Sequence, residues 1–526
     1  MLALLAVLGV AAAITFVALD GDDPEPSPIE GALGYDALDL VNPMRGQFDN
    51  IVTGLFPQSS PAQNALPDWP GSRDAAIRLT WRQLEPERGR YDFSLLDRAL
   101  DTYEQRGMRV ALRVSTYDSC CLQLDPGQRN LDVPDWVAET PGAVEEIDRD
   151  GVTQVIPRWN DDVYLAGFED LLAELGRRYD TDERLSIWEM SGYGDFGENV
   201  VSLLRDQLGR PGPGPDESEA ELGYFSQYED QFITAESAER LVAANLRAFP
   251  RTQIVSAPAN PFIMAQLLRD SPALEGVDHP VGVRSDCLGV LDVLPAWASS
   301  SASRYVERDD PLVDLITQRL REAPVLTEWC QVGDLDPADY YRAGLDAVIE
   351  RHVSMTSSSG FPDQLGDTAM DPDLYEVWRR ANVYAGYRYA TTAVARRDGD
   401  AVDVEATWSN LGVASTHEQW RVVYRLVDGS GAVVAEQQSD LDLRELVADQ
   451  DSSEGVPTPA TVRDEVALGS IAEGALGPGE YVVTATVEWD QHKRDATHRV
   501  DYPPMELALD GRSADGAYRI GTLRVG

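Results

Sequence analysis

The fold is decided by one strand–helix–strand run: AAIRLT at residues 75–80, FSLLDRALDTYEQR at 93–106 and MRVALRV at 108–114. The first and last pieces are short and largely apolar, as buried strands are. In the middle piece, apolar side chains recur three and four residues apart and predict one buried helix face: Leu95, Leu96, Ala99, Leu100 and Tyr103. Gly107 ends this helix. The run therefore predicts a β–α–β unit with parallel strands.

The same alternation continues along the chain for roughly 350 residues. Further helices are predicted at 164–179, 235–249 (with Thr234 as its cap), 312–321 and 338–350, and further strands at 185–190, 253–255, 281–283, 325–327 and 352–356. About eight such units are typical of a (β/α)₈ TIM barrel, to which we assign residues 31–394. A doubly wound sheet is the alternative, and it is disfavoured because the sequence lacks a Gly-rich phosphate-binding turn.

The pattern changes near residue 395, where helical spacing gives way to alternation with a period of two. Strands are predicted at 402–408, 420–426, 432–437 and 481–489, with turns such as DGSG at 428–431 and GPG at 477–479 between them. Short alternating strands separated by such turns predict an antiparallel all-β sandwich over residues 395–526.

Composition excludes several classes of function. The 526 residues carry 44 Lys and Arg against 90 Asp and Glu, and the resulting net charge of −46 repels the phosphates of nucleic acids. Four cysteines and five scattered histidines form no C-x-x-C or H-E-x-x-H motif, so neither a metal nor a cofactor is predicted. No G-x-S-x-G elbow or phosphate-binding loop occurs. Carboxylates and 11 tryptophans remain, a combination that suits sugar chemistry.

The N-terminus predicts export. Residues 2–19 form an uncharged, mostly apolar run, and an acidic, proline-rich linker follows at 21–30. The run is at the minimum length for a membrane span and at the upper end for a signal peptide. We therefore expect residues 1–20 to be a signal peptide or a membrane anchor, and the rest of the chain to be secreted or held at the outer face of the cytoplasmic membrane. The sequence makes no prediction of oligomeric state.

Five spaced segments carry a resemblance to a known family: NPMRG at 42–46, WRQLEPERGRYDF at 81–93, GYGDFGE at 192–198, RSDCLG at 284–289 and GAYRIG at 516–521. Together they resemble bacterial proteins catalogued as domain of unknown function 4832, in which a companion barrel, domain of unknown function 4874, precedes a sandwich. The barrel is similar to clan A glycosidases. That resemblance implies an acid/base after the fourth barrel strand and a nucleophile at the end of the seventh.

Three glutamates are the candidate catalytic residues. Glu328 ends the apolar run PVLT of the seventh strand and is the candidate nucleophile; a structural pair with an arginine is the alternative. The Asn-Glu pair usual after strand four in clan A is missing. Glu198, in the Gly-rich turn, is the candidate acid/base, or else a carboxylate that stabilises a helix N-terminus. Glu189 is the other carboxylate of this region, and an ion pair inside the barrel is its alternative role.

The candidate substrate-binding residues are basic, aromatic and acidic side chains near strand ends: Arg45, Arg78, Arg113, Trp81, Trp188, Trp329, Tyr193 and Asp286. The arginines would hold catalytic carboxylates or an acidic substrate group, and structural ion pairs are the alternative. The aromatic side chains would stack on sugar rings, and a place in the core is their alternative. Asp286 ends the sixth strand, where a polar substrate contact is expected.

The four cysteines each follow a predicted strand within a few residues, so all are expected at the carboxyl-terminal mouth of the barrel. Cys287 and Cys330 follow adjacent strands and would bridge, leaving the vicinal Cys120 and Cys121; pairing across to the latter two is the alternative.

These features predict an exported glycoside hydrolase-like enzyme that cleaves a poly- or oligosaccharide with two carboxylates. A non-catalytic polysaccharide-binding or assembly protein on the same barrel is the alternative, favoured by the missing Asn-Glu. The distance across the mouth separates the outcomes of catalysis, because carboxyl groups about 5–5.5 Å apart retain anomeric configuration and groups about 6.5–9.5 Å apart invert it.

Overall fold

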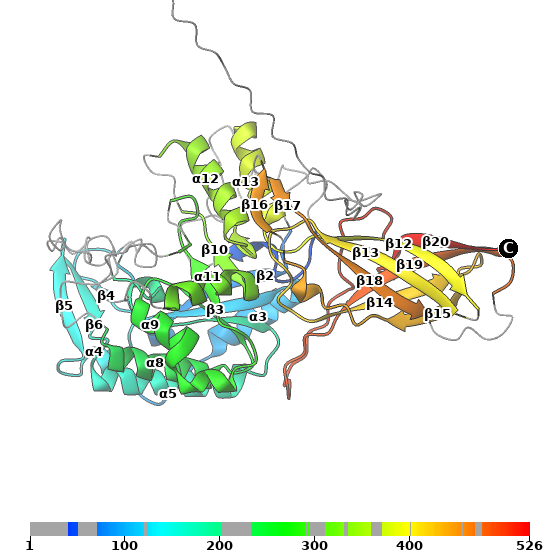
Figure 1. Ribbon diagram of the computed structural model, residues 1–526. Helices are drawn as coiled ribbons and strands as arrows, with labels where there is room; N and C mark the ends of the chain where they lie inside the picture. Colours follow the sequence, from blue (N-terminus) through cyan, green and yellow to red (C-terminus); the bar gives the residue numbers. More distant parts are fainter. Residues whose placement is uncertain are drawn as a thin grey trace, which may run out of the picture.

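Eight parallel strands close into a barrel, and an antiparallel sandwich lies against one end of it (Figure 1). The computed structural model describes residues 40–50, 71–119, 124–201, 233–290, 293–294, 311–330, 335–358, 371–399, 401–447, 449–453, 456–468 and 476–526. The predicted leader at 1–20 and linker at 21–30 lie outside these residues. Among the helices of the described residues, none combines the length and the apolar character needed to cross a bilayer.

The barrel strands are β1 (Gly46–Asn50), β2 (Asp74–Thr80), β3 (Arg109–Ser115), β7 (Leu185–Glu189), β8 (Gln253–Ser256), β9 (Gly282–Ser285), β10 (Val325–Thr327) and β11 (Met355–Ser357). Each pairs in parallel with the next, and β1 pairs with β11 to close the ring. The closed ring confirms the predicted (β/α)₈ barrel and excludes the doubly wound sheet, whose edges stay open.

The larger helices around the barrel are α3 (Ser94–Gln105), α5 (Asp162–Tyr179), α8 (Ala235–Ala248), α11 (Leu312–Glu322), α12 (Pro337–Glu350) and α13 (Pro372–Tyr384). Several begin at side-chain caps. The Thr234 hydroxyl accepts a hydrogen bond from the backbone N–H of Ser237 and starts α8, as predicted. Asp161, Asp336 and Asp371 cap α5, α12 and α13 in the same way.

The barrel interior changes from apolar to polar along the strands. A lower layer of buried side chains contains Phe48, Ala76, Ala111, Ile187, Val255, Leu326 and Met355. Because side chains alternate between the two faces of a strand, the residue two positions further on also points inward. On six strands that residue is polar: Asn50, Arg78, Arg113, Glu189, Glu328 and Ser357. The carboxyl-terminal end of the barrel is therefore the polar end, where barrel enzymes carry their sites.

The strand-to-helix connections build up this polar end. After β3 the chain forms β4 (Arg129–Asn130), α4 (Asp135–Ala138), β5 (Val144–Arg149) and β6 (Val152–Pro157), and the three strands pair as a small sheet. In Figure 1 this sheet lies at the end of the molecule opposite the sandwich. Shorter elements are α2 (Trp81–Leu84), η1 (Asp195–Gly197), α9 (Pro261–Ala265), the π-helix η3 (Gln266–Asp270) and η4 (Pro272–Gly276).

The sandwich packs two antiparallel sheets face to face. One contains β12 (Tyr389–Asp398), β13 (Ala401–Asn410) and β18 (Ala460–Leu468); the other contains β14 (Trp420–Val427), β15 (Val433–Gln438), β19 (Gly479–Trp489) and β20 (Tyr518–Val525). A turn η5 (Leu443–Glu445) and a hairpin of β16 (Asp449–Ser453) and β17 (Val456–Thr458) complete it, the hairpin lying beside α12 (Figure 1). The predicted boundary after residue 394 falls inside β12.

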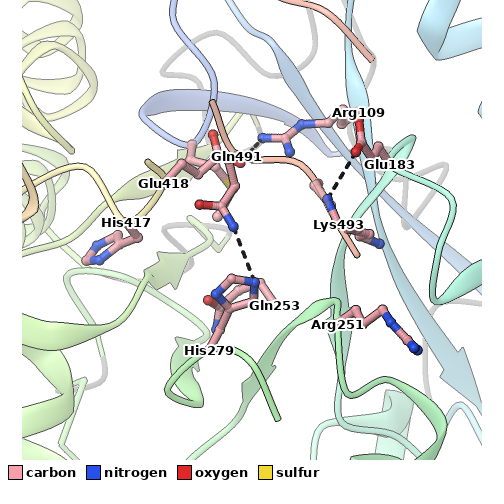
Figure 2. A pocket seen from close by; sticks show the side chains of 11 residues that line it. Arg109, Glu183, Arg251, Gln253, His279, His417, Glu418, Gln491 and Lys493 are labelled. Carbon is pink, nitrogen blue, oxygen red and sulfur yellow. Dashed lines mark hydrogen bonds and ion pairs between the residues drawn. The ribbon is translucent and has the colours of Figure 1, made fainter. Parts of the chain in front are cut away.

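The sandwich contacts the amino-terminal end of the barrel. Arg109, at the start of β3, forms an ion pair of 2.6 Å with Glu418. Lys493 donates from Nζ to the carbonyl oxygens of Asp182 and Leu185, at 3.0 and 2.8 Å. Figure 2 shows the small cavity between these groups, lined by residues of both domains. The base of the barrel is thus covered, and the mouth is the end that remains for a site.

Candidate active site

Arg284 is the centre of the polar mouth. It lies on β9, and its guanidinium reaches four carboxylates. Nε lies 2.9 Å from Glu189 Oε2, Nη2 lies 2.9 Å from Glu328 Oε2, and Nη1 lies 3.6 Å from Glu198 Oε1 and in close contact with Asp286. A buried guanidinium with donors in a fixed plane can hold several carboxylates in one orientation. Arg284 therefore sets the relative positions of the acidic groups around it.

Glu328 is fixed by its neighbours at the end of β10. Its backbone N–H donates to the carbonyl oxygen of Ser285 at 3.2 Å, and its own carbonyl oxygen accepts from the N–H of Leu288 at 2.9 Å. Asn50 Nδ2 donates to Glu328 Oε2 at 2.9 Å. The neighbouring strand β9 and the loop after it thus hold the backbone of Glu328, and Asn50 of β1 holds its carboxylate. A nucleophile must be held within fractions of an ångström, and contacts of this kind supply such support.

A disulfide between Cys287 and Cys330 joins the loops that follow β9 and β10. This is the pairing predicted for adjacent strands, and it lies at the mouth beside Asp286 and Glu328. Cys120 and Cys121 lie outside the described residues.

Glu198 stands at the end of a tightly wound turn after β7. Five residues of this turn adopt backbone conformations with positive φ: Gly192 (105°), Gly194 (82°), Phe196 (58°), Gly197 (76°) and Asn199 (58°). A left-handed non-glycine residue costs free energy and persists only where its surroundings enforce it. A Cβ at Gly197 would lie 2.9 Å from the carbonyl oxygen of Val114, so this close approach requires glycine.

The turn is held against the loop after β3. The backbone N–H of Phe196 donates to the carbonyl oxygen of Tyr117 at 2.9 Å. Buried Asp195 accepts a hydrogen bond of 2.8 Å from the N–H of Ser119 and another from its hydroxyl. Burial raises the pKa of Asp195 well above its usual range, against these hydrogen bonds, which lower it. Asp195 thus stabilises the turn through its hydrogen bonds, and Glu198 is the carboxylate that the turn presents to the mouth.

Arg113 completes the cluster from β3. Its Nη1 lies 2.7 Å from Glu198 Oε1 and 3.7 Å from Glu189 Oε2. Glu189 is therefore enclosed by two guanidiniums, those of Arg113 and Arg284, and it is buried. This is the interior ion pair that the sequence offered as the alternative to a catalytic role for Glu189.

The remaining carboxylates converge. Glu198, Asp286 and Glu328 each offer an oxygen atom within 4.8 Å of the other two, and all three are partly exposed. Three oxygens at this spacing could also ligate a cation, but the cation would compete with the guanidinium of Arg284, which already contacts all three. Glycoside cleavage likewise requires two carboxyl groups at short range.

The aromatic predictions are corrected by the structure. Trp81, Trp188, Trp329 and Tyr193 are all fully buried in the hydrophobic core. Trp188 stacks on Phe249, with ring centroids 4.1 Å apart, and none of the four offers a free ring face for a sugar.

Of the two remaining arginines, only Arg45 departs from its prediction. Arg45 lies at the base of the barrel, where it donates to the carbonyl oxygens of Leu40 and, at 2.8 Å, of Val383. It is far from the strand ends that form the mouth. Arg78 lies nearer the mouth and forms an ion pair of 2.7 Å with Asp118. The structure thus brings together the predicted residues Glu328, Glu198, Glu189, Arg113 and Asp286.

Sequence reasoning missed Arg284 and Asn50. Arg284 was part of a quoted motif, and its position on a short buried strand, one residue from the strand end, was the available signal. Asn50 offered the same signal at the end of β1. Both follow from the alternation of inward-pointing residues once the strand ends are known.

Among the comparisons with known proteins, one family model matches part of the barrel. The model of glycoside hydrolase family 42, described as beta-galactosidase, matches residues 76–198, from β2 to Glu198, which is less than half of the chain. No curated protein matches the sequence. Together with the closed barrel, the family match makes the chain glycoside hydrolase-like.

Solved structures resemble the chain at low sequence identity. The catalytic domain of a beta-amylase from Paenibacillus polymyxa is 12% identical with a TM-score of 0.35, over 64% of this chain and 98% of its own. Endo-glycoceramidase II from Rhodococcus sp., solved as a lactosyl-enzyme intermediate, is 13% identical with a TM-score of 0.35, over 82% and 99%. An exo-beta-1,4-mannosidase from an Opitutaceae bacterium is 16% identical with a TM-score of 0.31, over 67% and 58%.

Proposed function

We propose that the protein is an exported glycoside hydrolase that cleaves a poly- or oligosaccharide with Glu328 as nucleophile and Glu198 as acid/base. The observation that carries the proposal is the meeting of these two carboxylates, from the end of strand β10 and from the turn after β7, with oxygens within 4.8 Å. The partial match to a glycoside hydrolase family supports the same class of reaction. Kinship with the proteins of domain of unknown function 4832, and export by the N-terminal apolar run, are parts of this proposal.

The spacing favours retention of anomeric configuration. A separation of about 5–5.5 Å leaves no room for a water between the carboxylate and the sugar, so the carboxylate itself attacks the anomeric carbon. Glu328 forms a bond to that carbon while Glu198 gives its proton to the departing oxygen. Water then displaces Glu328 and gives its proton to Glu198. Both guanidiniums of the site offset part of the negative charge of the carboxylates during these steps.

One observation favours the second candidate, a non-catalytic polysaccharide-binding protein. Arg284 occupies oxygens of both Glu198 and Glu328, as in a purely structural network. In such a protein the mouth would bind a sugar without cleaving it.

The test is hydrolysis of a panel of aryl glycosides and polysaccharides by purified protein, with Glu328→Gln as the control. We expect turnover by the wild type, loss of about 10⁴-fold in Glu328→Gln, and a first product of retained configuration by proton NMR. Turnover that survives in Glu328→Gln contradicts the assignment of the nucleophile. Binding of oligosaccharide by calorimetry with no turnover in the wild type supports the second candidate instead.

A further inference from the structure

Two carboxyl groups of the mouth lie close together. Asp286, directly after β9, and Glu198, in the turn after β7, each place a carboxylate oxygen within 4.8 Å of the other, and Nη1 of Arg284 lies beside both. Two ionised carboxylates this close repel each other, so the arrangement favours one proton held between them.

The charges around the pair favour keeping that proton. The groups that face it come from four strands: Arg113 of β3, Glu189 of β7, Arg284 of β9 and Glu328 after β10. With Asp286 and Glu198 included, four carboxylates share two guanidiniums, so full ionisation would leave two excess negative charges. One retained proton halves this excess.

Burial acts in the same direction. Burial and the neighbouring Glu198 together raise the pKa of Asp286 to about 7, although Arg284 and Arg113 act to lower it. Because the two groups are coupled, the proton belongs to the pair rather than to either residue. An Asp286 carboxyl with this pKa can hold a proton beside Glu198 near neutral pH.

We propose that Asp286 shares one proton with Glu198 and so keeps the acid/base supplied with the proton that the leaving group needs. Asp286 is a positioning residue, since it acts through Glu198. The inference rests on the proposed function.

The proposed reaction takes one proton from the Asp286–Glu198 pair and later returns one to it. Glu328 forms a bond to the anomeric carbon as the glycosidic carbon–oxygen bond breaks. The departing oxygen keeps the electron pair of that bond and takes the shared proton, which leaves Asp286 and Glu198 both ionised beside Arg284. In the second half, water forms a bond to the anomeric carbon, the bond to Glu328 breaks, and the proton of the water returns to the pair.

The first experiment compares two aryl glycosides of one sugar, chosen from the panel above. A phenyl leaving group needs a proton, whereas a dinitrophenyl group departs without one. In Asp286→Asn we expect kcat/KM to fall about 10²-fold for the phenyl glycoside, with a loss at least about tenfold smaller for the dinitrophenyl glycoside. The alkaline limb of the pH profile should move down by about one pH unit, because Glu198 then faces two arginines without a shared proton.

Asp118→Asn is the control, because it removes another aspartate near the mouth that is paired with an arginine, Arg78. It should change the rates on both glycosides by the same factor. Equal losses on both glycosides in Asp286→Asn, with an unmoved pH profile, would show that Asp286 is only structural and overturn the inference.

A second measurement needs no turnover. In wild-type protein labelled with ¹³C at aspartate carboxyls, we expect an NMR resonance of Asp286 that titrates near neutral pH. In Glu198→Gln it should titrate at lower pH, because the amide can donate to the Asp286 carboxylate without a shared proton. A titration that Glu198→Gln does not move overturns the pair even if the enzyme is active. An inactive wild type with the expected titration supports the pair and rejects the proposed function.

Discussion

Arg109 at the base of the barrel and Arg284 at its mouth are both buried guanidiniums that hold glutamates, but their surroundings differ. Arg109 pairs with Glu418 at 2.6 Å, and the rings of Trp489 and Tyr502 lie 5.5 and 5.2 Å from its guanidinium carbon. Trp489 Nε1 also donates to the second oxygen of the glutamate, at 3.1 Å. Aromatic rings thus enclose the ion pair at the base of the barrel, and both carboxylate oxygens of Glu418 accept a hydrogen bond.

The mouth of the barrel has more carboxylates than the base, and they are more exposed to solvent. The side chains of Asp286 and Glu328 are each 19% exposed, whereas that of Glu418 is 8% exposed. Four carboxylates at the mouth share two arginines. An ion pair enclosed by rings connects two domains, whereas an open cluster with surplus acid can accept a ligand and exchange protons. The following predictions test this contrast.

The largest expected effect on stability is that of a substitution at the base of the barrel. Glu418→Gln replaces one carboxylate oxygen by an amide that must face a donor, either Arg109 or Trp489, and leaves the guanidinium with less compensation. Breaking one partner of a buried ion pair costs about 3 kcal/mol or more, so we expect that loss in the free energy of unfolding by denaturant titration. The exposed Glu436→Gln, which removes a surface partner of Arg425, should cost less than about 1 kcal/mol. Equal losses would contradict the contrast between enclosed and open pairs.

A smaller effect concerns pH at the same interface. His417 lies at the base, where Nε2 is 3.0 Å from the hydroxyl of Ser354. Burial lowers its pKa to about 4, and His352 adds to this, from an unfolded value of 6.5. Between these values the unfolded chain binds more protons, so the contribution of neutral His417 is complete above pH 6.5 and is lost as pH falls toward 4.

We therefore expect His417→Gln to lose less stability than the wild type between about pH 7 and about pH 4.5. The difference should be on the order of 2 kcal/mol in unfolding free energies measured at both pH values. Identical pH dependence in the two proteins would show that the histidine is not buried in a neutral form.

The sequence predicted the barrel because its signals are local. The strand and helix of β2 and α3 each carry their own periodicity, and Thr234 marks the start of α8 without reference to the rest of the fold. Strand ends were less predictable. The strand expected at 352–356 is β11 at Met355–Ser357, because pairing with β1 and β10 decides where it runs.

The residues of the site, too, were predictable only where their signals in the sequence are local. Glu328 could be found because a carboxylate after an apolar strand points into the mouth of a barrel. Trp329, the next residue, could not be placed, because its ring fills the space left by Gly344 of α12, where a Cβ would lie 2.4 Å away. Arg284 was missed because a charge on a buried strand makes sense only with its four partners, which come from distant parts of the sequence.

The smallest expected effect sharpens the comparison at the mouth. Glu328→Gln is the same chemical change as Glu418→Gln, but it removes one of four carboxylates that share two arginines. Arg284 keeps Glu189, Glu198 and Asp286 as partners, and a Gln amide oxygen can still accept from Asn50. Relief of like-charge repulsion should then outweigh the lost ion pair, as is common where residues serve activity rather than stability.

We therefore expect Glu328→Gln to gain about 1 kcal/mol in the free energy of unfolding near neutral pH while turnover is lost. The gain should shrink in acid, because protonated carboxyl groups no longer repel one another. Glu418→Gln, measured alongside by the same denaturant titration, should lose stability. If both substitutions destabilise the protein to the same extent, the carboxylates of the mouth are compensated by arginine as fully as Glu418 at the base. The excess of carboxylates at the mouth would then have no effect on stability.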